Sequence, residues 1–286
     1  MISVVVLTYN SLRSIKRCLD SLLAQDLSDL EVIVVDNGSL DGSVEFIQKY
    51  YPQVKLIGNK SNLGASRGRN QGITLAQGEW VLTLDCDVVL ERNFLKAARE
   101  LIGSLRDYRV GMLQPKILME DQKTAYSCGI YLTGLRRFYD IGRGKSGAKP
   151  LGVNKNIFGA CSAAAFYRRS MLEDIKEKSG YFDERFFFLV EDVDLSWRSR
   201  HKGWRTVFSP ETICYHSGGS SSINKNMRQY LCWRNRYYSI IKNDGFFKYF
   251  GKVFPFLLYD FPRLVYLLIV NPYARNWITG NAVRTE

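Results

Sequence analysis

Two aspartates separated by one residue follow an apolar run in the first third of the chain. Asp85 and Asp87 flank Cys86 directly after residues 80–84, Trp-Val-Leu-Thr-Leu. Carboxylate oxygens are hard ligands that suit Mg²⁺ or Mn²⁺, and these metals commonly join one or two carboxylates to phosphates. The alternative is a loop that caps a helix beginning near Glu91. The pattern indicates a divalent-metal site if the apolar run is a strand that ends at a ligand-binding edge.

A second acidic group opens a stretch with helical pattern at residues 191–201. Glu191, Asp192 and Asp194 follow three phenylalanines at 186–188. The helix dipole favours carboxylates in a first turn, so these three residues could have a purely structural role. An apolar aromatic wall can instead raise the pKa of a carboxylate and prepare it to act as a general base.

Three further groups are candidate ligand contacts. Asp36 ends an apolar run, and its carboxylate suits a base N–H or a ribose hydroxyl, although residues 36–42 are also good turn chemistry. Glycines at 64, 68 and 72 surround Arg69. They indicate either backbone close to phosphate with an arginine fork or close helix packing, and the G-K-[ST] ending of a P-loop is absent. His216 precedes two glycines and is a candidate metal ligand, although a lone histidine is more often structural.

The elements that must position these residues alternate between strand and helix over the first hundred residues. Apolar runs predict strands at 2–7, 31–35, 54–57 and 80–84, and helical spacing predicts helices at 12–23, 44–50, 63–76 and 94–105. Strands without polar alternation that alternate with helices predict a parallel sheet covered on both faces. Ligands bind such sheets at the carboxyl ends of the strands, where Thr8, Asp36 and Asp85 stand.

The rest of the chain is less regular. Residues 108–168 predict a mixed region with an exposed loop at 142–150, followed by a strand at 206–215 interrupted at Ser209 and Pro210. Residues 227–270 are helical in character but broken by Pro255 and Pro262. The apolar stretch 253–270 is a poor membrane span because it contains charges and two prolines, so it predicts an interfacial segment or a helix packed on the preceding domain.

The composition favours an anionic partner. The formal net charge is +12, and ten Lys or Arg stand against three Asp or Glu from Ile223 onward. The same stretch is rich in Phe, Tyr and Leu, which favours a membrane surface over nucleic acid, and the alternative is an ordinary solvated helix face. None of the six cysteines shows C-x-x-C spacing, so buried thiols in a reducing compartment are expected. No signal-peptide pattern opens the chain, and a cytoplasmic protein is expected.

Taken in order and at these spacings, the motifs resemble those of the family-two inverting glycosyltransferases of GT-A fold, especially the rhamnosyltransferase-like branch. The resemblance runs from Ser3 to about Asn235. It rests on residues 4–10 (VVVLTYN), 34–43 (VVDNGSLDGS), 62–72 (NLGASRGRNQG), 85–87 (DCD) and 182–198 (FDERFFFLVEDVDLSWR), with Gly203-Trp204, His216 and Arg234-Asn235. That branch often has Asn-Pro-Asp in place of Asp85-Cys86-Asp87, which leaves UDP-hexose donors open beside dTDP-rhamnose.

The resemblance implies a fold and roles for these residues. A Rossmann-like α/β domain with a mostly parallel sheet would occupy residues 1–225, with a helical C-terminal extension at 226–286. Asp192 would be the catalytic base and Glu191 would orient the acceptor. The metal ligands would be Asp85, Asp87 and His216. The nucleotide-sugar pocket would be formed by Thr8, Tyr9, Asn10, Asp36, Asn37, Asn62, Arg69 and Asp85.

The implied activity is metal-dependent inverting transfer of a sugar from a nucleotide diphosphate sugar to a hydroxyl of a glycan or polyprenyl-linked acceptor. The setting would be cell-surface polysaccharide synthesis, at the inner face of the cell membrane. One alternative, a sugar nucleotidyltransferase, would need a glycine-rich basic signature after the first strand, where the chain has Thr8-Tyr9-Asn10-Ser11. The other alternative, a non-catalytic membrane-binding module, would not need the acidic site residues.

Overall fold

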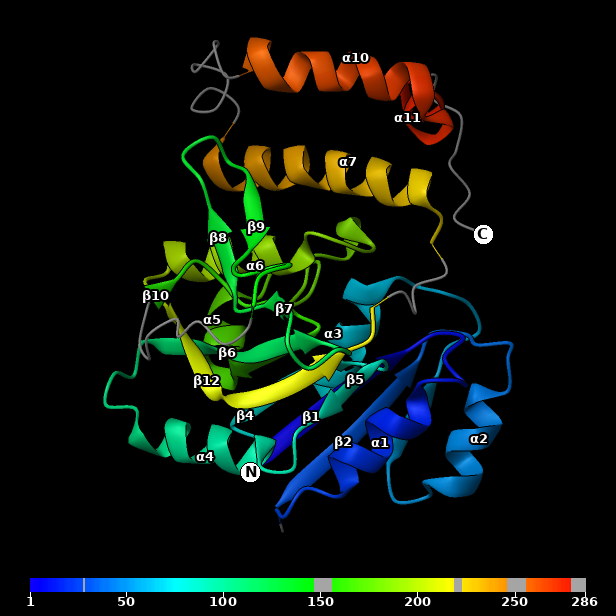
Figure 1. The fold of residues 1–286 in the computed structure, drawn as a ribbon, viewed down its shortest axis with the longest axis vertical. Coiled ribbons are helices and arrows are strands. Elements are labelled where there is room, and N and C mark those ends of the chain that lie inside the picture. The colour runs from blue at the N-terminus through cyan, green and yellow to red at the C-terminus, as the bar shows by residue number, and fades with distance from the viewer. Residues whose placement is uncertain (28, 147–155, 219–222, 246–255, 279–286) are drawn as a thin grey trace.

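The computed structural model describes residues 1–27, 29–146, 156–218, 223–245 and 256–278 (Figure 1). A mixed sheet crosses the molecule in the order β10-β12-β6-β11-β4-β1-β2-β3, with β5 paired to β12 and β7 paired to β6. Its strands are β1 (Ile2–Thr8), β2 (Leu30–Asp36), β3 (Lys55–Gly58), β4 (Trp80–Asp85), β5 (Val88–Leu90), β6 (Val110–Met119), β7 (Ala125–Ser127), β10 (Asn156–Ile157), β11 (Ala164–Arg168) and β12 (Arg205–His216). A separate two-stranded sheet pairs β8 (Ile130–Leu132) with β9 (Phe138–Asp140).

β1, β2, β3 and β4 form the predicted parallel unit, in which β3 pairs parallel with β2. β1 lies between β2 and β4, and all three run in the same direction. The register pairs Thr8 with Asp36 and Leu7 with Asp85, so the three strands end side by side. This alignment confirms the expectation that the polar residues after the apolar runs meet at one edge of the sheet.

The second half of the sheet is not parallel throughout. β11 runs antiparallel to both of its neighbours, β4 and β6, while β12 runs parallel to β6. The register of β12 against β6 shifts between Ser209 and Ile213, where Pro210 cannot donate to the ladder. The predicted interruption of this strand is therefore a bulge inside one long strand.

Helices cover both faces of the sheet, which explains why consecutive residues in the middle of β1 are apolar. Val4 and Val6 belong to the core beneath α1 (Ile15–Leu23) and α4 (Phe94–Ser104), whereas Val5 belongs to the core on the opposite face. That face is covered by α3 (Ala65–Leu75), α5 (Arg169–Ile175) and α6 (Glu191–His201), and α2 (Ser43–Tyr50) lies beside β3. A Cβ on Gly72 of α3 would lie 2.2 Å from Val5 Cγ1, so this glycine serves close helix packing.

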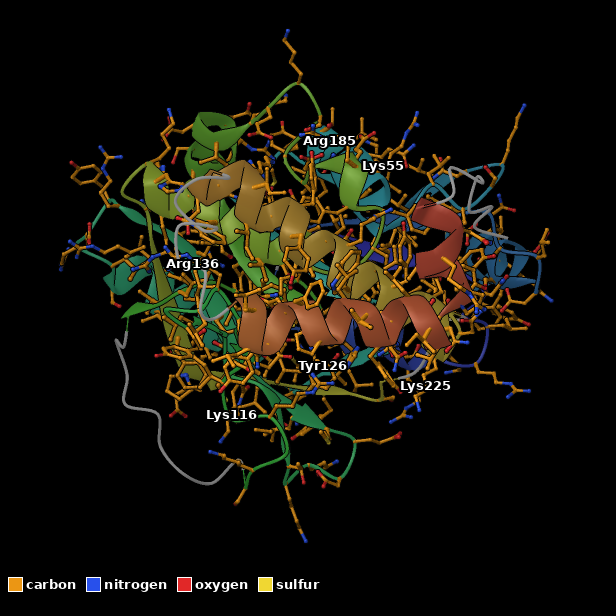
Figure 2. All side chains as sticks on the ribbon, turned by 90° about the horizontal axis from the view of Figure 1, so that it is seen from above. Lys55, Lys116, Tyr126, Arg136, Arg185 and Lys225 are labelled. Atoms are coloured by element: carbon orange, nitrogen blue, oxygen red, sulfur yellow. The ribbon has the colours of Figure 1, made fainter. Side chains whose placement is uncertain are left out.

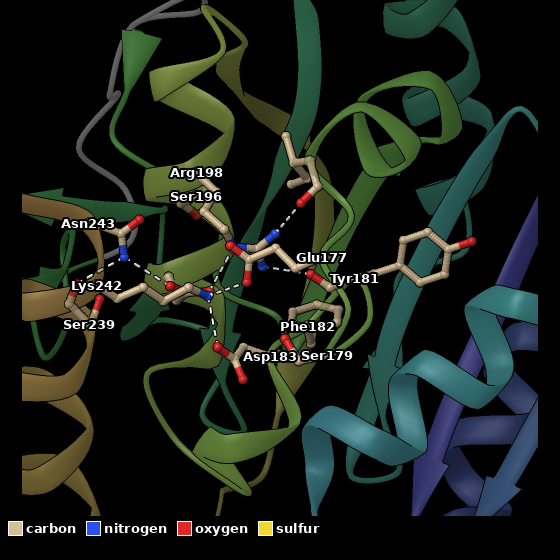
Figure 3. Close-up of polar contacts among 12 residues, drawn as sticks. Glu177, Ser179, Tyr181, Phe182, Asp183, Ser196, Arg198, Ser239, Lys242 and Asn243 are labelled. Atoms are coloured by element: carbon tan, nitrogen blue, oxygen red, sulfur yellow. Dashed lines mark hydrogen bonds and ion pairs between the residues drawn. The ribbon is translucent and has the colours of Figure 1, made fainter.

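The long helix α7 (Lys225–Asp244) is joined to α6 by a buried ion cluster, drawn in Figure 3. Lys242 Nζ lies 2.7 Å from Glu177 Oε2, 2.8 Å from Asp183 Oδ2 and 2.9 Å from Asp194 Oδ2. Asp194 also accepts from Arg198 Nε at 2.9 Å. Burial raises the pKa of Asp183, but hydrogen bonds from Arg185 and Lys242 outweigh burial and lower it. These contacts favour the charged form of Asp183 and fasten α7 to the body of the protein.

The C-terminal segment forms a layer above α7 in Figure 1. It contains the π-helix η2 (Phe256–Asp260), α10 (Phe261–Val270) and α11 (Pro272–Ile278). Pro262 stands at the start of α10, where its missing N–H is harmless, and Pro255 lies outside the described residues. No helix in the described ranges has the length and apolarity that crossing a bilayer requires. The proposed division at 225/226 stays a prediction, and so does the loop at 142–150, of which residues 147–150 lie outside the described residues.

The cysteines follow the expectation of small buried side chains. Five of the six, all except Cys232, are buried, and all six thiols are free. Burial raises the pKa of the Cys214 thiol, so this side chain stays neutral and packs as a small apolar group.

Candidate active site

Asp85, Asp87 and His216 come together because a short strand pairs with the end of a long one. Asp85 is the last residue of β4, and Asp87 directly precedes β5. β5 then pairs antiparallel with β12, with Val88 opposite His216. His216 Nε2 consequently lies 3.0 Å from Asp87 Oδ1 and 3.9 Å from Asp85 Oδ2. One potential ligand atom from each of the three residues lies within 4.8 Å of the others.

This donor set fits a divalent cation. Two carboxylates are the ligands that Mg²⁺ and Mn²⁺ favour, and the imidazole adds one nitrogen. Burial lowers the pKa of His216, but the hydrogen bond to Asp87 and the charges of Asp87 and Asp85 outweigh burial and raise it. The two carboxylates thus favour the protonated form of the ring, which would bring a positive charge to them. A metal would take over this role, because binding requires the neutral ring and releases a proton.

The three side chains open into a cavity of about 350 Å³ at the carboxyl ends of the parallel strands. Eight of the predicted site residues line it: Thr8, Tyr9, Asn37, Asn62, Arg69, Asp85, Asp87 and His216. Four others, Asn10, Asp36, Glu191 and Asp192, are not in its lining. The cavity therefore collects the predicted metal ligands and most of the predicted nucleotide contacts, while the predicted base Asp192 is partly exposed outside its lining.

Asp36 and Asn10 hold the loop beside the cavity. Asp36 is buried, and its Oδ2 accepts from the backbone N–H groups of Gly38 at 3.0 Å and Ser39 at 2.9 Å. Asn10 Oδ1 accepts from Leu40 N–H at 2.9 Å across the same loop. These contacts are the turn chemistry that the sequence offered as the alternative for Asp36. A direct contact with a nucleotide stays a prediction for both residues.

Asn37 organises the next stretch of cavity wall. Its Nδ2 donates to Gly64 O at 3.0 Å and to Asn62 Oδ1 at 3.2 Å. Its Oδ1 accepts from Asn59 Nδ2 at 3.0 Å. The amide thereby fixes the segment that leads from β3 into α3, which carries Arg69.

Arg69 connects the candidate metal ligand Asp85 with the helix that carries the predicted base. Its Nη2 donates to Asp85 Oδ1 at 2.8 Å, and its Nη1 donates to Glu191 Oε1 at 2.6 Å. The side chain is only 3% exposed. Burial lowers the pKa of Arg69, but the charges of Asp85 and Glu191 outweigh burial and raise it. Both ends of the guanidinium thus contact carboxylates, and its predicted contact with base or diphosphate is untested.

Asp192 is held in the first turn of α6. Its Oδ1 accepts from Val193 N–H at 2.9 Å, and its Oδ2 accepts from Ser162 N–H at 3.2 Å. Burial and the neighbouring charge of Glu191 raise the pKa of Asp192 to about 7. Burial also raises the pKa of Glu191, although Arg69 opposes that rise. A carboxylate that titrates near neutrality suits general-base chemistry.

The turn before α6 contains the predicted aromatic wall and contributes Phe187, Phe188 and Leu189 to the cavity lining, but its backbone strain was not predicted. Phe187, Leu189 and Val190 all adopt positive φ, between 63° and 74°. Such backbone costs of the order of 1–3 kcal/mol per residue unless its surroundings hold it. Asn235 of α7 stabilises this turn, since its Nδ2 lies 2.7–3.0 Å from the carbonyl oxygens of Phe186, Phe188 and Leu189. The Arg234-Asn235 pair belonged to the family resemblance, but no local pattern indicated that Asn235 contacts this turn.

Two more residues lie beside the candidate metal ligands and were not predicted. The ring of Tyr126 meets His216 edge-on with centroids 4.2 Å apart, and Arg143 Cζ lies 4.2 Å from the centre of the same ring. Both line the cavity. They come from β7 and the turn after β9, and no local pattern connects those segments with the metal ligands. Arg143 places a positive charge where an anionic group would bind.

Comparison with solved structures identifies the fold. The chain matches residues 1–349 of TarS from S. aureus in complex with UDP-GlcNAc, with a TM-score of 0.57 and 22% identity, over 85% of this chain and 67% of that one. It also matches GalNAc-T7 with UDP, GalNAc and Mn²⁺, with a TM-score of 0.63 and 16% identity, over 84% and 47% of the two chains. These neighbours are GT-A glycosyltransferases, and the predicted fold class is confirmed.

Comparison of the sequences identifies the family. The poly-beta-1,6-N-acetyl-D-glucosamine synthase of Staphylococcus aureus (strain COL) is 24% identical over 267 residues, which cover 92% of this chain and 60% of the relative. The chain spans between 26% and 60% of the length of the curated relatives it matches. Residues 3–176 match the family described as Glycosyl transferase family 2. The predicted enzyme class is thereby confirmed at the level of the family: the chain belongs to glycosyl transferase family 2.

Proposed function

We propose that this protein is a metal-dependent, inverting glycosyltransferase that moves a sugar from a nucleotide diphosphate sugar to a hydroxyl of a glycan or lipid-linked acceptor. The observation that carries the proposal is the cluster of Asp85, Asp87 and His216 in a cavity of about 350 Å³ at the strand ends. Membership of the family supports sugar transfer, and the cavity supports a donor with an anionic centre. The metal ligands and the base are the residues predicted from the sequence.

The diphosphate of the donor would bind beside the three candidate metal ligands. Asp85, Asp87 and His216 would hold the cation, and a cation bound there supplies positive charge that stabilises the departing nucleoside diphosphate. Arg143 would add a further positive charge from its place on the Tyr126 ring beside His216. Thr8, Tyr9 and Asn37 would contact the nucleoside because they line the cavity at the ends of β1 and β2. The loop held by Asp36 and Asn10 would close the nucleoside end.

The acceptor side of the reaction is assigned to the first turn of α6. Asp192 would take the proton of the acceptor hydroxyl as the hydroxyl oxygen forms its bond to the anomeric carbon. The bond between that carbon and the phosphate oxygen breaks, and its electron pair leaves with the diphosphate. Attack opposite to the leaving group inverts the anomeric configuration. Glu191, fixed by Arg69 at 2.6 Å, would orient the acceptor.

A UDP-sugar is the donor that the comparisons favour. The TarS structure contains UDP-GlcNAc, and the GalNAc-T7 structure contains UDP. dTDP-rhamnose remains the donor suggested by the rhamnosyltransferase-like branch, although Cys86 replaces its usual proline. Mn²⁺ is favoured over Mg²⁺, since one of the ligands is a nitrogen and Mg²⁺ prefers oxygen. The GalNAc-T7 structure likewise holds Mn²⁺.

Cell-surface polysaccharide synthesis is the proposed setting. The relative from S. aureus is named as a poly-beta-1,6-N-acetyl-D-glucosamine synthase. A lipid-linked acceptor would bring the protein to the inner face of the cell membrane. The basic and aromatic residues 226–286 are the part of the chain that we assign to this contact.

The test is a panel of nucleotide sugars incubated with the full chain, with and without Mn²⁺, and analysed by mass spectrometry. We expect one UDP-sugar to be hydrolysed slowly to UDP and free sugar, and only with the metal. Formation of a nucleotide sugar from a nucleoside triphosphate and a sugar phosphate would instead identify a nucleotidyltransferase. A chain that neither binds nor cleaves any donor would refute the proposal.

A further inference from the structure

The outer surface of η2 and α10 is apolar and exposed. Leu258 and Ile269 are each 66% exposed, and Tyr266 is 59% exposed between them. Phe261 and Val265 lie in the same stretch and are exposed as well. Figure 2 looks onto this end of the molecule, where α10 lies in front beside α7. A contiguous exposed apolar surface of this kind indicates a contact with a partner or a membrane.

The opposite side of α10 is occupied by the protein itself. Leu267 is buried, and Leu264 and Leu268 pack with it against Met227 and Leu231 of α7. Asn271 Nδ2 donates to Asn226 O at 2.8 Å and ties the end of the helix to α7. The helix is therefore apolar on both sides, and only one of them is needed to hold it in place.

The charges around this surface are positive. Asp244 and Asp260 are the two acidic residues in the described part of 223–278, and their side chains are only 4% and 5% exposed because each pairs with an arginine. Arg263 and Arg275 are exposed on the same segment. Figure 2 shows Lys225 near one end of the two helices. The face thus combines exposed apolar side chains with exposed cations and buried anions.

We infer that the outer face of η2 and α10 lies in the plane of an anionic membrane, with its apolar side chains inserted at the boundary of headgroups and acyl chains. Apolar side chains rimmed by Lys and Arg, in a helix that does not span, are the signature of interfacial binding. Tyr259 and Tyr266 suit this depth because their rings are apolar and their hydroxyls reach water. The inference rests on the membrane location within the proposed function and specifies the surface that provides it.

A second copy of the chain fits this face less well. Pairing two such faces would bring Arg263 and Arg275 of both copies together without exposed carboxylates to neutralise them. A bilayer with anionic lipid supplies the complementary charge, and each basic residue near such a surface contributes about 1 kcal/mol. Anionic lipid is therefore the occupant that matches both features of the surface.

The test is sedimentation of the full chain with vesicles of phosphatidylcholine that contain phosphatidylglycerol. Leu258→Ser/Ile269→Ser changes no charge and touches only exposed side chains, so folding should be unaffected, and we expect its partition coefficient to fall at least about tenfold. The matched control is Tyr50→Ser/Tyr108→Ser, since Tyr50 is 56% and Tyr108 is 71% exposed on other surfaces. Arg263→Gln should lower the coefficient about fivefold, and only with phosphatidylglycerol present.

Two outcomes would overturn the inference. One is vesicle binding that the Leu258→Ser/Ile269→Ser variant leaves unchanged. The other is a concentration-dependent dimer in sedimentation velocity that the Leu258→Ser/Ile269→Ser variant abolishes, in a protein that does not bind vesicles. Hydrolysis of the donor should be unaffected in the Leu258→Ser/Ile269→Ser variant, since its changes lie on the outer surface of η2 and α10. Loss of vesicle binding with intact donor hydrolysis would support the assignment of this face as the membrane-binding surface. Vesicle binding by a protein that does not hydrolyse any donor would refute only the proposed function.

Discussion

The guanidinium of Arg69 lies 2.6 Å from Glu191 Oε1, and this ion pair joins two parts of the site that come from distant segments. The other arm of Arg69 reaches Asp85 at 2.8 Å. Asp85 is one of the three candidate metal ligands at the strand ends, and Glu191 is the first residue of the helix that carries Asp192. Arg69 therefore sets the distance between the proposed donor and acceptor sides.

Arg69→Lys should separate the charge of this residue from its geometry. A lysine keeps the positive charge, but its single ammonium lacks the fork that contacts both carboxylates at once. We expect transfer to fall by at least about a hundredfold, as for a lost positioning contact. The melting temperature should also fall, because one buried carboxylate loses its partner. Steady-state kinetics and thermal unfolding measure both effects, and near-normal kinetics with lysine would show that charge alone suffices.

Asp192→Asn should abolish proton transfer and preserve binding. The amide has nearly the same shape and can still accept from Ser162 N–H through its oxygen. A positioned base typically contributes about 10²–10⁴-fold in rate, and we expect transfer to fall by that factor. Calorimetry should find the affinity for the donor unchanged. Transfer within a fewfold of wild type would remove Asp192 from the role of base.

The pKa of Asp192 near 7 gives the reaction a defined pH dependence. Only the ionised carboxylate can accept a proton, so kcat/KM should rise tenfold per pH unit below about 7 and level off above it. Glu191 shares its environment, and the observed limb belongs to the pair. Transfer measured from pH 5.5 to 8.5 checks this, and the residual activity of Asp192→Asn should lack the limb.

The raised pKa of Asp192 should make the folded protein less stable as pH rises, whereas transfer activity should increase with pH. A carboxyl group that is harder to ionise in the fold than its ordinary value of 3.8 contributes stability at low pH, and this is lost as pH rises toward 7. Without metal, Asp192→Asn should therefore melt above wild type at pH 8 and close to it at pH 4. A difference that does not change with pH would contradict the raised pKa.

The parts of the site that the sequence predicted are those that local pattern controls. Each parallel strand is an apolar run with a polar residue at its end, and parallel strands must end together, so Thr8, Asp36 and Asp85 were placed correctly. The antiparallel insertion of β11 carries no such signal, because a fully buried strand looks the same in either direction. The balance of parallel and antiparallel pairs was therefore not readable from the sequence.

The contacts that sequence reasoning missed all depend on long-range pairing. Tyr126 and Arg143 approach His216 because β7 pairs with β6 and the turn after β9 folds back over it. Asn235 reaches the turn before α6 only because α7 packs across that helix. Nothing in the residues next to Asn235 reveals the strained carbonyls that it satisfies, since their positive φ is itself set by the tertiary structure.

Asp87→Ala should abolish the contribution of metal to donor binding. Asp87 is buried beside His216, and its loss removes one of two carboxylates from the proposed ligand set. We expect calorimetry to detect donor binding that no longer responds to Mn²⁺. Glu100→Ala, which removes an exposed carboxylate of α4, is the matched control and should bind as wild type. Unchanged Mn²⁺-dependent affinity in Asp87→Ala would refute this metal site.

Lys242→Met should show that α7 is part of the folded body. The lysine contacts Asp183 and Asp194, which are fully buried, and its own side chain is 13% exposed. Removing one partner of a buried ion cluster costs about 3–5 kcal/mol, because the carboxylates stay buried with fewer partners. Urea unfolding at pH 7 measures this loss. The loss should shrink as pH falls, since the pKa of Asp183 is lowered in the fold and protonation removes the charge that Lys242 compensates.

The control for this cluster is Lys202→Met. Lys202 lies 3.8 Å from Asp174, but its side chain is 58% exposed, and such surface pairs contribute about 0–1 kcal/mol. Equal losses in the two variants would mean that the buried cluster does not hold α7. A large loss for Lys242→Met alone, together with a single unfolding transition, would mean that α7 unfolds with the sheet, as expected if Asn235 and Lys242 both fasten it to α6.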